Sequence, residues 1–168
     1  MTYDVIIIGA GPGGIFSAFE LMQRRPEWKV AVLEAGNPLE KRHCPIDGDK
    51  VKSCIHCKTC AIMNGFGGAG AFSDGKLNTG TKDLRHGYIL EEFVRFGASE
   101  DILVDAKPHV GTDKLYVVLQ NLRREIIDRG GEVRFSHKVV DIEQNSGSVT
   151  ALRVSAPEGE YTLPTKHV

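Results

Sequence analysis

The amino-acid sequence predicts an α/β fold in which a parallel sheet is joined to a small antiparallel β-meander. Two short apolar runs near the N-terminus have the character of buried parallel strands. A glycine-rich turn and a stretch of helical periodicity separate them, as in a strand–helix–strand unit. Short β-branched segments separated by turn residues follow near the end of the chain and predict the meander.

The first strand is predicted over residues 4–9, Asp-Val-Ile-Ile-Ile-Gly, because a continuous β-branched run suits a strand covered on both faces. A helix is expected from Pro12, since the first helical turn tolerates proline. Its apolar face is marked at helical spacing by Ile15, Ala18, Phe19 and Met22. Pro26 ends this helix, and residues 29–34 form the second strand.

The turn between the first strand and the helix matches the dinucleotide-binding pattern G-x-G-x-x-G. Gly9 allows a tight turn, Gly11 allows the backbone to approach a pyrophosphate, and Gly14 allows close packing of helix on strand. Glu34 follows Gly14 by 20 residues, where a carboxylate can accept hydrogen bonds from the ribose hydroxyls. The predicted cofactor-binding residues here are Gly9, Gly11, Pro12, Gly13, Gly14 and Glu34. The fold class is therefore a Rossmann-like, FAD- or NAD(P)-binding parallel sheet.

The rest of the chain divides into three stretches beyond this βαβ unit at residues 1–36. Residues 37–80 read as a Cys- and Gly-rich loop, and residues 84–131 as a helical segment. In the latter we expect Asp113 to cap the longer helix and Gly130-Gly131 to end it. Residues 132–164 are assigned to the meander.

Charge and terminal composition exclude several classes of protein. The chain has 21 Lys and Arg against 22 Asp and Glu, so it has no basic footprint for nucleic acid. The apolar run Val5 to Ile8 is far too short to span a membrane, and the N-terminus lacks the basic start of a secretory signal. We therefore expect a cytoplasmic protein.

All four cysteines lie between residues 44 and 60. Cys54, Cys57 and Cys60 form C-x-x-C-x-x-C, and Cys44 precedes a proline, a combination known from iron–sulfur sites. The same thiolates would suit zinc, and either close pair would suit a redox-active dithiol. Four reduced cysteines without any cofactor are the remaining alternative.

The chain resembles the two-dinucleotide-fold flavoproteins related to glutathione reductase. Within these it is most similar to a bacterial group known as uncharacterised FAD-dependent dehydrogenases. The resemblance lies in the fingerprint with Glu34, in residues 65–78 and 108–114, and in the cysteine cluster with Cys44-Pro45. It implies FAD and a redox reaction on an unknown small-molecule substrate. It also implies that the backbone of Val139 reads the adenine.

Further candidate site residues lie in the glycine-rich stretch and beyond it. The candidates for cofactor binding are Arg42, Gly68, Ala69, Gly70 and Val139, and the candidates for catalysis are Ser73, Asp74, Lys76 and His109. Flexible backbone in this stretch could offer N–H groups to a phosphate or to the flavin edge. An ordinary exposed loop, and a structural role for His109, are the alternatives.

The sequence thus predicts an FAD-binding oxidoreductase, a dehydrogenase or reductase in which the flavin accepts a hydride or electrons and NAD(P)H could serve as co-substrate. The alternative is a non-catalytic NAD- or FAD-binding or electron-transfer module with an iron–sulfur or zinc cluster. We expect residues 1–168 to be the N-terminal part of one FAD-binding domain, whose remaining strands and substrate domain are missing. Such a piece should self-associate through an exposed apolar face and bind FAD weakly or not at all.

Overall fold

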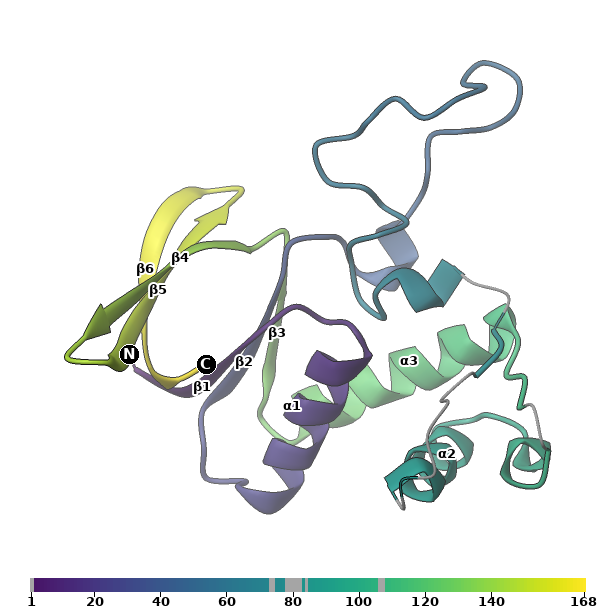
Figure 1. Cartoon of the computed structure of the whole chain (residues 1–168), viewed down its shortest axis with the longest axis horizontal. Helices are drawn as coiled ribbons and strands as arrows, with labels where there is room; N and C mark the ends of the chain where they lie inside the picture. Colours follow the sequence, from purple (N-terminus) through teal and green to yellow (C-terminus); the bar gives the residue numbers. More distant parts are fainter. Residues whose placement is uncertain (1, 73–74, 78–82, 84, 106–107) are drawn as a thin grey trace.

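A computed structural model describes residues 2–72, 75–77, 83, 85–105 and 108–168 of the chain. It is a mixed α/β fold built on one six-stranded sheet (Figure 1). The strands are β1 (Tyr3–Ile8), β2 (Val30–Glu34), β3 (Glu132–Phe135), β4 (Lys138–Asn145), β5 (Ser148–Ala156) and β6 (Gly159–His167). The helices are α1 (Pro12–Arg24), α2 (Arg85–Arg95) and α3 (Thr112–Asp128), with short 3-10 turns η1 (Leu39–Lys41), η2 (Ala69–Phe72) and η3 (Glu100–Leu103).

The sheet has the strand order β3-β2-β1-β6-β5-β4. β1, β2 and β3 run parallel, and β4, β5 and β6 form an antiparallel meander. The strand–helix–strand unit predicted near the N-terminus is present as β1, α1 and β2. The predicted turn at residues 145–147 joins β4 to β5, with Ser146 and Gly147 both in the left-handed region that such hairpins require.

Three predictions about the later elements are corrected by the structure. β3 was assigned to the meander, but it pairs in parallel with β2, from Ala31 beside Glu132 to Glu34 beside Phe135. The return to the parallel sheet was expected beyond residue 168, yet the end of β6 already pairs in parallel with β1. Strand pairing depends on partners distant in sequence, which local patterns do not reveal.

The third correction concerns the start of α3. Gly111, not Asp113, is the N-cap residue, and no side chain caps the helix. Asp113 instead lies in the first turn, where its negative charge favours the positive end of the helix dipole. The predicted end of α3 is confirmed, because Gly130 has a φ of 91° and the N–H of Gly131 donates to the carbonyl of Ile126 over 2.9 Å.

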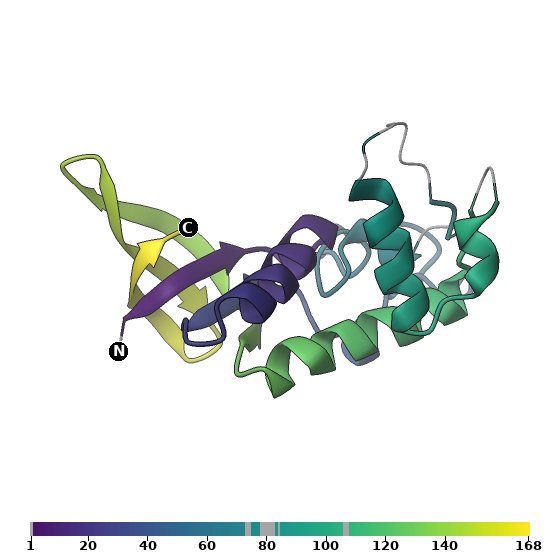
Figure 2. The same ribbon diagram turned by 90° about the horizontal axis from the view of Figure 1, so that it is seen from below.

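The parallel strands separate two hydrophobic cores. In β2 the side chains alternate strictly, so that Val30 and Val32 face the helices while Ala31 and Leu33 face the meander. On the helical side Ile15, Phe19, Val118 and Leu122 complete the larger core; on the other side Leu152 and Val154 of β5 pack on the sheet. Figures 1 and 2 show the helices and the meander on opposite sides of these strands.

A long segment without helix or strand joins η1 to η2. Figure 1 shows its first part, in blue, extending away from the sheet and the helices. Its second part returns to the core, where the side chain of Phe66 is fully buried against Phe135. In the described part of the chain, no helix is long and apolar enough to cross a membrane.

Candidate dinucleotide-binding site

The turn from β1 into α1 has the geometry that its glycines predict. Gly9 has a φ of 93°, a conformation that favours glycine, and its N–H donates to the carbonyl of Leu33 over 2.8 Å. A Cβ built on Gly14 would lie 2.0 Å from the carbonyl oxygen of Gly9, so any larger residue would push α1 off the turn. The close packing expected of Gly14 is therefore confirmed.

Gly11 faces open space at the start of α1. A Cβ added to Gly11 or Gly13 would meet no atom within 4 Å. Gly11 is the N-cap residue and no side chain caps the helix, while Pro12 occupies the first turn. Because the first N–H groups of a helix lack partners within it, this end of α1 can offer donors and a positive dipole to an anion.

The carboxylate of Glu34 lies immediately behind this turn. The side chain is only 6% exposed. Its Oε2 accepts a hydrogen bond from the N–H of Ala10 over 2.8 Å. Its Oε1 accepts from the N–H of Gly36 over 2.7 Å and of Gly65 over 2.9 Å. Since a carboxylate has about four acceptor positions, one remains for a ligand hydroxyl.

The glycine-rich stretch after the long loop folds back onto the fingerprint turn. The N–H of Gly67 donates to the carbonyl of Ala10 over 2.8 Å. A Cβ on Gly68, whose φ is 65°, would lie 3.2 Å from the Cα of Gly11. Two of the predicted cofactor-binding segments, 54 or more residues apart by sequence number, are thus adjacent in the fold.

Arg42 holds this stretch in place. It is 6% exposed, and its guanidinium lies 4.5 Å from the centre of the Phe72 ring. Its nitrogens donate to the carbonyls of Ala61, Ile62, Phe66 and Gly68 over 2.7 to 2.9 Å. Burial lowers the pKa of Arg42, and the negative charge of Glu34 opposes that change. Four of about five N–H donors are therefore committed to the backbone, so the contribution of Arg42 to a ligand site is to shape the loop.

An apolar cavity of about 120 Å³ opens beside the turn. Pro12, Gly70 and Lys76, all predicted site residues, line it together with apolar side chains of α1, α2 and α3. The segments around Lys76 and His109 pair as a short antiparallel bridge, which brings these two candidate catalytic residues side by side. Both side chains are exposed. Ser73 and Asp74 lie outside the described residues.

Val139 lies in β4, close to the end of β2. The preceding residues are tied to that end, because the N–H of His137 donates to the carbonyl of Glu34 over 2.9 Å and the N–H of Ser136 donates to the carbonyl of Gly36 over 2.9 Å. The side chain of Val139 packs on the smaller core. Val139 therefore lies near Glu34, as it must if its backbone is to contact the adenine of a bound cofactor. That contact stays a prediction.

Sequence reasoning missed the backbone donors that surround Glu34. Gly36 and Gly65 are in such close contact that a Cβ on Gly36 would lie 2.3 Å from the nitrogen of Gly65. Phe66, fully buried, anchors the same segment. A buried carboxylate at a strand end signals that donors are needed, but nothing in the local pattern shows that they come from a loop some thirty residues away.

The four cysteines all line a second hollow, of about 280 Å³, on the projecting loop. Cys54 and Cys57 are exposed, Cys44 and Cys60 are half-buried, and all four are free thiols. Over the residues that the structure describes, no three His, Cys, Asp or Glu side chains are arranged to hold a single metal ion. The four are therefore near one another, but they do not converge on one point.

Comparison with known proteins supports the fold. No family model matches the chain. It is 38% identical over 150 residues to an uncharacterised protein of Clostridium beijerinckii, which covers 89% of this chain and 28% of that protein. It is 30% identical to a 12-dehydrotetracycline 5-monooxygenase/anhydrotetracycline 6-monooxygenase of Streptomyces rimosus, over 97% of this chain and 29% of that one. The chain thus spans less than a third of the curated relatives it matches.

Comparison with solved structures finds proteins of similar fold. The anhydrotetracycline hydroxylase OxyS of Streptomyces rimosus superimposes over 99% of this chain and 30% of its own, with a TM-score of 0.55 and 22% identity. The chondrochloren halogenase CndH of a myxobacterium, described as FAD-dependent, superimposes over 98% and 36%, with a TM-score of 0.54 and 17% identity. At these identities the likeness shows a shared α/β fold.

Proposed function

We propose that this chain forms the ADP-binding part of a Rossmann-like domain in an FAD-dependent oxidoreductase. The observation that carries the proposal is the start of α1, where an uncapped helix end faces the open space in front of Gly11. A pyrophosphate needs free N–H donors and an approach unhindered by side chains, and this turn supplies both.

The residues around the turn fit the remaining parts of an ADP group. The free acceptor position of Glu34 would take a ribose hydroxyl, and its negative charge would disfavour a 2′-phosphate. The backbone of Val139 would contact the adenine from the adjacent strand. Gly68, Ala69 and Gly70 would close over the phosphates, because Gly68 already lies against Gly11.

FAD is favoured over NAD by two kinds of support. The chain leaves the strand–helix alternation after β2 for a long glycine-rich loop, which a nicotinamide dehydrogenase would not usually do. The halogenase that shares the fold is described as FAD-dependent, and the related tetracycline enzyme is a monooxygenase by name. Bound FAD would supply the capacity to accept a hydride or an electron pair.

The reaction type within this class follows less directly from the site. The relatives favour monooxygenation, whereas the resemblance noted in the sequence favours a dehydrogenase or reductase. In either case Lys76, which lines the apolar cavity, and His109, its partner in the antiparallel bridge, would hold or move a proton near the reacting part of a small-molecule substrate. NAD(P)H as the source of reducing equivalents belongs to the same proposal.

The test is FAD binding by a variant that fills the open space without disturbing the fold. In the full-length protein Gly11→Val should abolish retention of FAD, since the added branches occupy the approach to the helix end, while the unfolding midpoint stays close to that of the unchanged protein. Gly87→Ala is the matched control, because Gly87 is an exposed glycine of α2 whose added Cβ also meets nothing within 4 Å. A Gly11→Val protein that retains FAD as well as the control would refute the proposed site.

A further inference from the structure

The loop that contains the four cysteines, residues 44–60, is a candidate site for a second cofactor, independent of FAD. We propose that Cys44, Cys54, Cys57 and Cys60 bind a [4Fe–4S] cluster, each thiolate holding a different iron. The inference rests on the arrangement of the four sulfurs, the hydrogen bonding at Cys54, the charge of the loop and its lack of other support. None of these depends on the dinucleotide site.

The four cysteines share one hollow, and this bears on the kind of metal group that the loop could hold. Tetrahedral zinc, with Zn–S distances of about 2.3 Å, would draw its sulfurs to within about 4 Å of one another. In the described residues no three ligands converge in that way, although all four cysteines line one hollow of about 280 Å³. A cluster takes one thiolate at each of its four irons, so it requires four cysteines around one hollow but does not require them to meet at a single atom.

The backbone at Cys54 has a feature of cluster-binding loops. The N–H of His56 points at the sulfur of Cys54, with 3.5 Å between nitrogen and sulfur. His56 has a φ of 50°, which is uncommon for a residue other than glycine and turns this N–H toward the sulfur. Hydrogen bonds to cysteine sulfur are one means by which proteins stabilise iron–sulfur clusters and set their potentials.

The charges on the loop complement an anionic cluster. Between Cys44 and Cys60 the charged side chains are Lys50, Lys52 and Lys58 against Asp47 and Asp49, an excess of one positive charge. The guanidinium of Arg42 is close enough to Cys60 for the two groups to influence each other electrostatically. This small excess of positive charge favours an anionic cluster over a cationic one at the loop.

The loop also lacks support of its own. Every residue from 52 to 59 is exposed, including Ile55 at 58%, so this part of the chain contributes nothing to either core. Figure 1 shows it projecting beyond the compact part of the molecule. Segments too small to bury a core are commonly stabilised by a metal or a disulfide, and the four cysteines here are unpaired.

The experiment is anaerobic reconstitution of the full chain with sulfide and with both ferrous and ferric iron, with no FAD added. We expect about four iron and four sulfide ions per chain, a broad visible absorption, and an electron paramagnetic resonance signal after reduction. Cys57→Ser and Cys44→Ser should each lose most of the iron. Ser53→Ala, an exposed substitution in the same loop, is the control and should retain it.

Folding of the serine variants is checked by circular dichroism and by the unfolding midpoint, which should hardly change because none of the cysteines belongs to a core. One zinc ion per chain without sulfide would overturn the proposal, and so would a metal-free disulfide. Full iron content in folded Cys44→Ser protein would equally overturn it, because four ligands are required. FAD binding is measured separately, so each proposal can fail without the other.

Discussion

Glu34 illustrates how one residue serves both the fold and the proposed ligand. Its carboxylate joins three segments, because it accepts N–H groups from the β1–α1 turn, from the end of β2 and from the glycine-rich stretch. Such a buried charge is tolerated because it is nearly saturated with donors. In the proposed function its remaining acceptor position would take a ribose hydroxyl in a fixed orientation.

This arrangement predicts that Glu34→Gln destabilises the fold as well as weakening ligand binding. The amide oxygen of glutamine can still accept from the N–H groups on one side of the carboxylate position. The amide NH₂ group cannot accept from the N–H on the other side, so a hydrogen bond to a charged group, worth about 1.5–3 kcal/mol, is lost. The free energy of unfolding at neutral pH, from urea denaturation, measures this cost. Glu40→Gln is the control, since Glu40 makes an exposed ion pair with Arg123 worth at most about 1 kcal/mol. Equal losses in the two variants would contradict the role assigned to Glu34.

At the scale of elements, local sequence patterns predicted what local forces determine. The strand, the glycine turn, the helix from Pro12 and the hairpin at residues 145–147 all follow from short-range sterics and burial. Three other features do not follow from local patterns. They are the parallel pairing of β3 with β2, the parallel pairing of β6 with β1, and the packing of residues Gly65 to Gly68 on the glycine turn. They arise from contacts between residues far apart in the chain, which a single sequence does not display.

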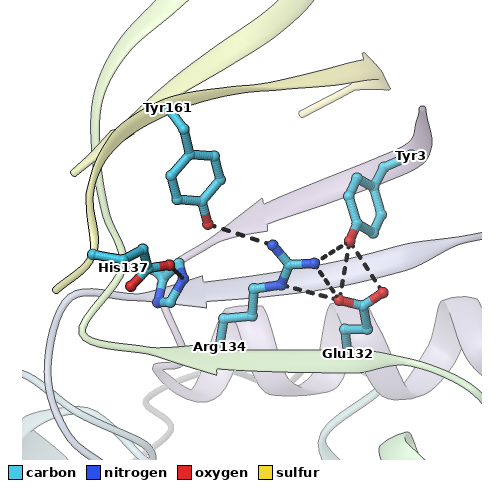
Figure 3. Close-up of polar contacts among 6 residues, drawn as sticks. Tyr3, Glu132, Arg134, His137 and Tyr161 are labelled. Atoms are coloured by element: carbon cyan, nitrogen blue, oxygen red, sulfur yellow. Dashed lines mark hydrogen bonds and ion pairs between the residues drawn. The ribbon is translucent and has the colours of Figure 1, made fainter. Parts of the chain in front are cut away.

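The junction between the parallel sheet and the meander contains a polar cluster, drawn in Figure 3. The hydroxyl of Tyr3 donates to the Glu132 carboxylate over 3.0 Å, and Arg134 donates to both Tyr3 and Glu132. Arg134 also reaches the hydroxyl of Tyr161 on β6, with 3.4 Å between the atoms. The cluster thus ties β1 and β3 to the meander.

This cluster predicts loss of stability at alkaline pH. Burial, followed by the hydrogen bond to Glu132, raises the pKa of Tyr3. A group whose pKa is raised on folding stabilises the fold below its unfolded pKa, about 10 for tyrosine, and loses that contribution as the pH rises through the folded value. The stability difference between the unchanged chain and Tyr3→Phe should therefore be largest at neutral pH and shrink above pH 10.

The measurement is urea denaturation of both proteins across this pH range. Tyr116→Phe, on the exposed side of α3, is the control and should follow the unchanged chain. Burial and the hydrogen bond to Glu20 raise the pKa of Tyr88 to about 12. Tyr88 therefore adds a loss of stability at alkaline pH that is common to all three proteins. A Tyr3→Phe difference that does not change with pH would show that Tyr3 does not titrate within this junction.

At the scale of the whole molecule, the candidate ligand contacts gather at one edge of the sheet. The glycine turn follows β1, Glu34 ends β2, and Val139 lies shortly after β3. In open α/β sheets, ligands bind outside the carboxyl ends of the parallel strands, where loops from neighbouring strands meet. The two cores on opposite faces hold these strands in register and so fix the distances between the three contacts.

In the proposed function all three contacts would be made to the adenosine and the pyrophosphate, and this leads to a prediction about ligand selectivity. If the described residues bind the ADP half in this way, ADP should compete with FAD for the chain at a similar, weak affinity, and riboflavin should not compete. Competition titrations followed by flavin fluorescence measure both. Gly11→Val, which blocks the pyrophosphate, should remove ADP and FAD binding together. If riboflavin bound as tightly as FAD, or if ADP failed to displace FAD, the flavin ring and not the ADP group would be the part recognised, and the assignment of the glycine turn and Glu34 would be wrong.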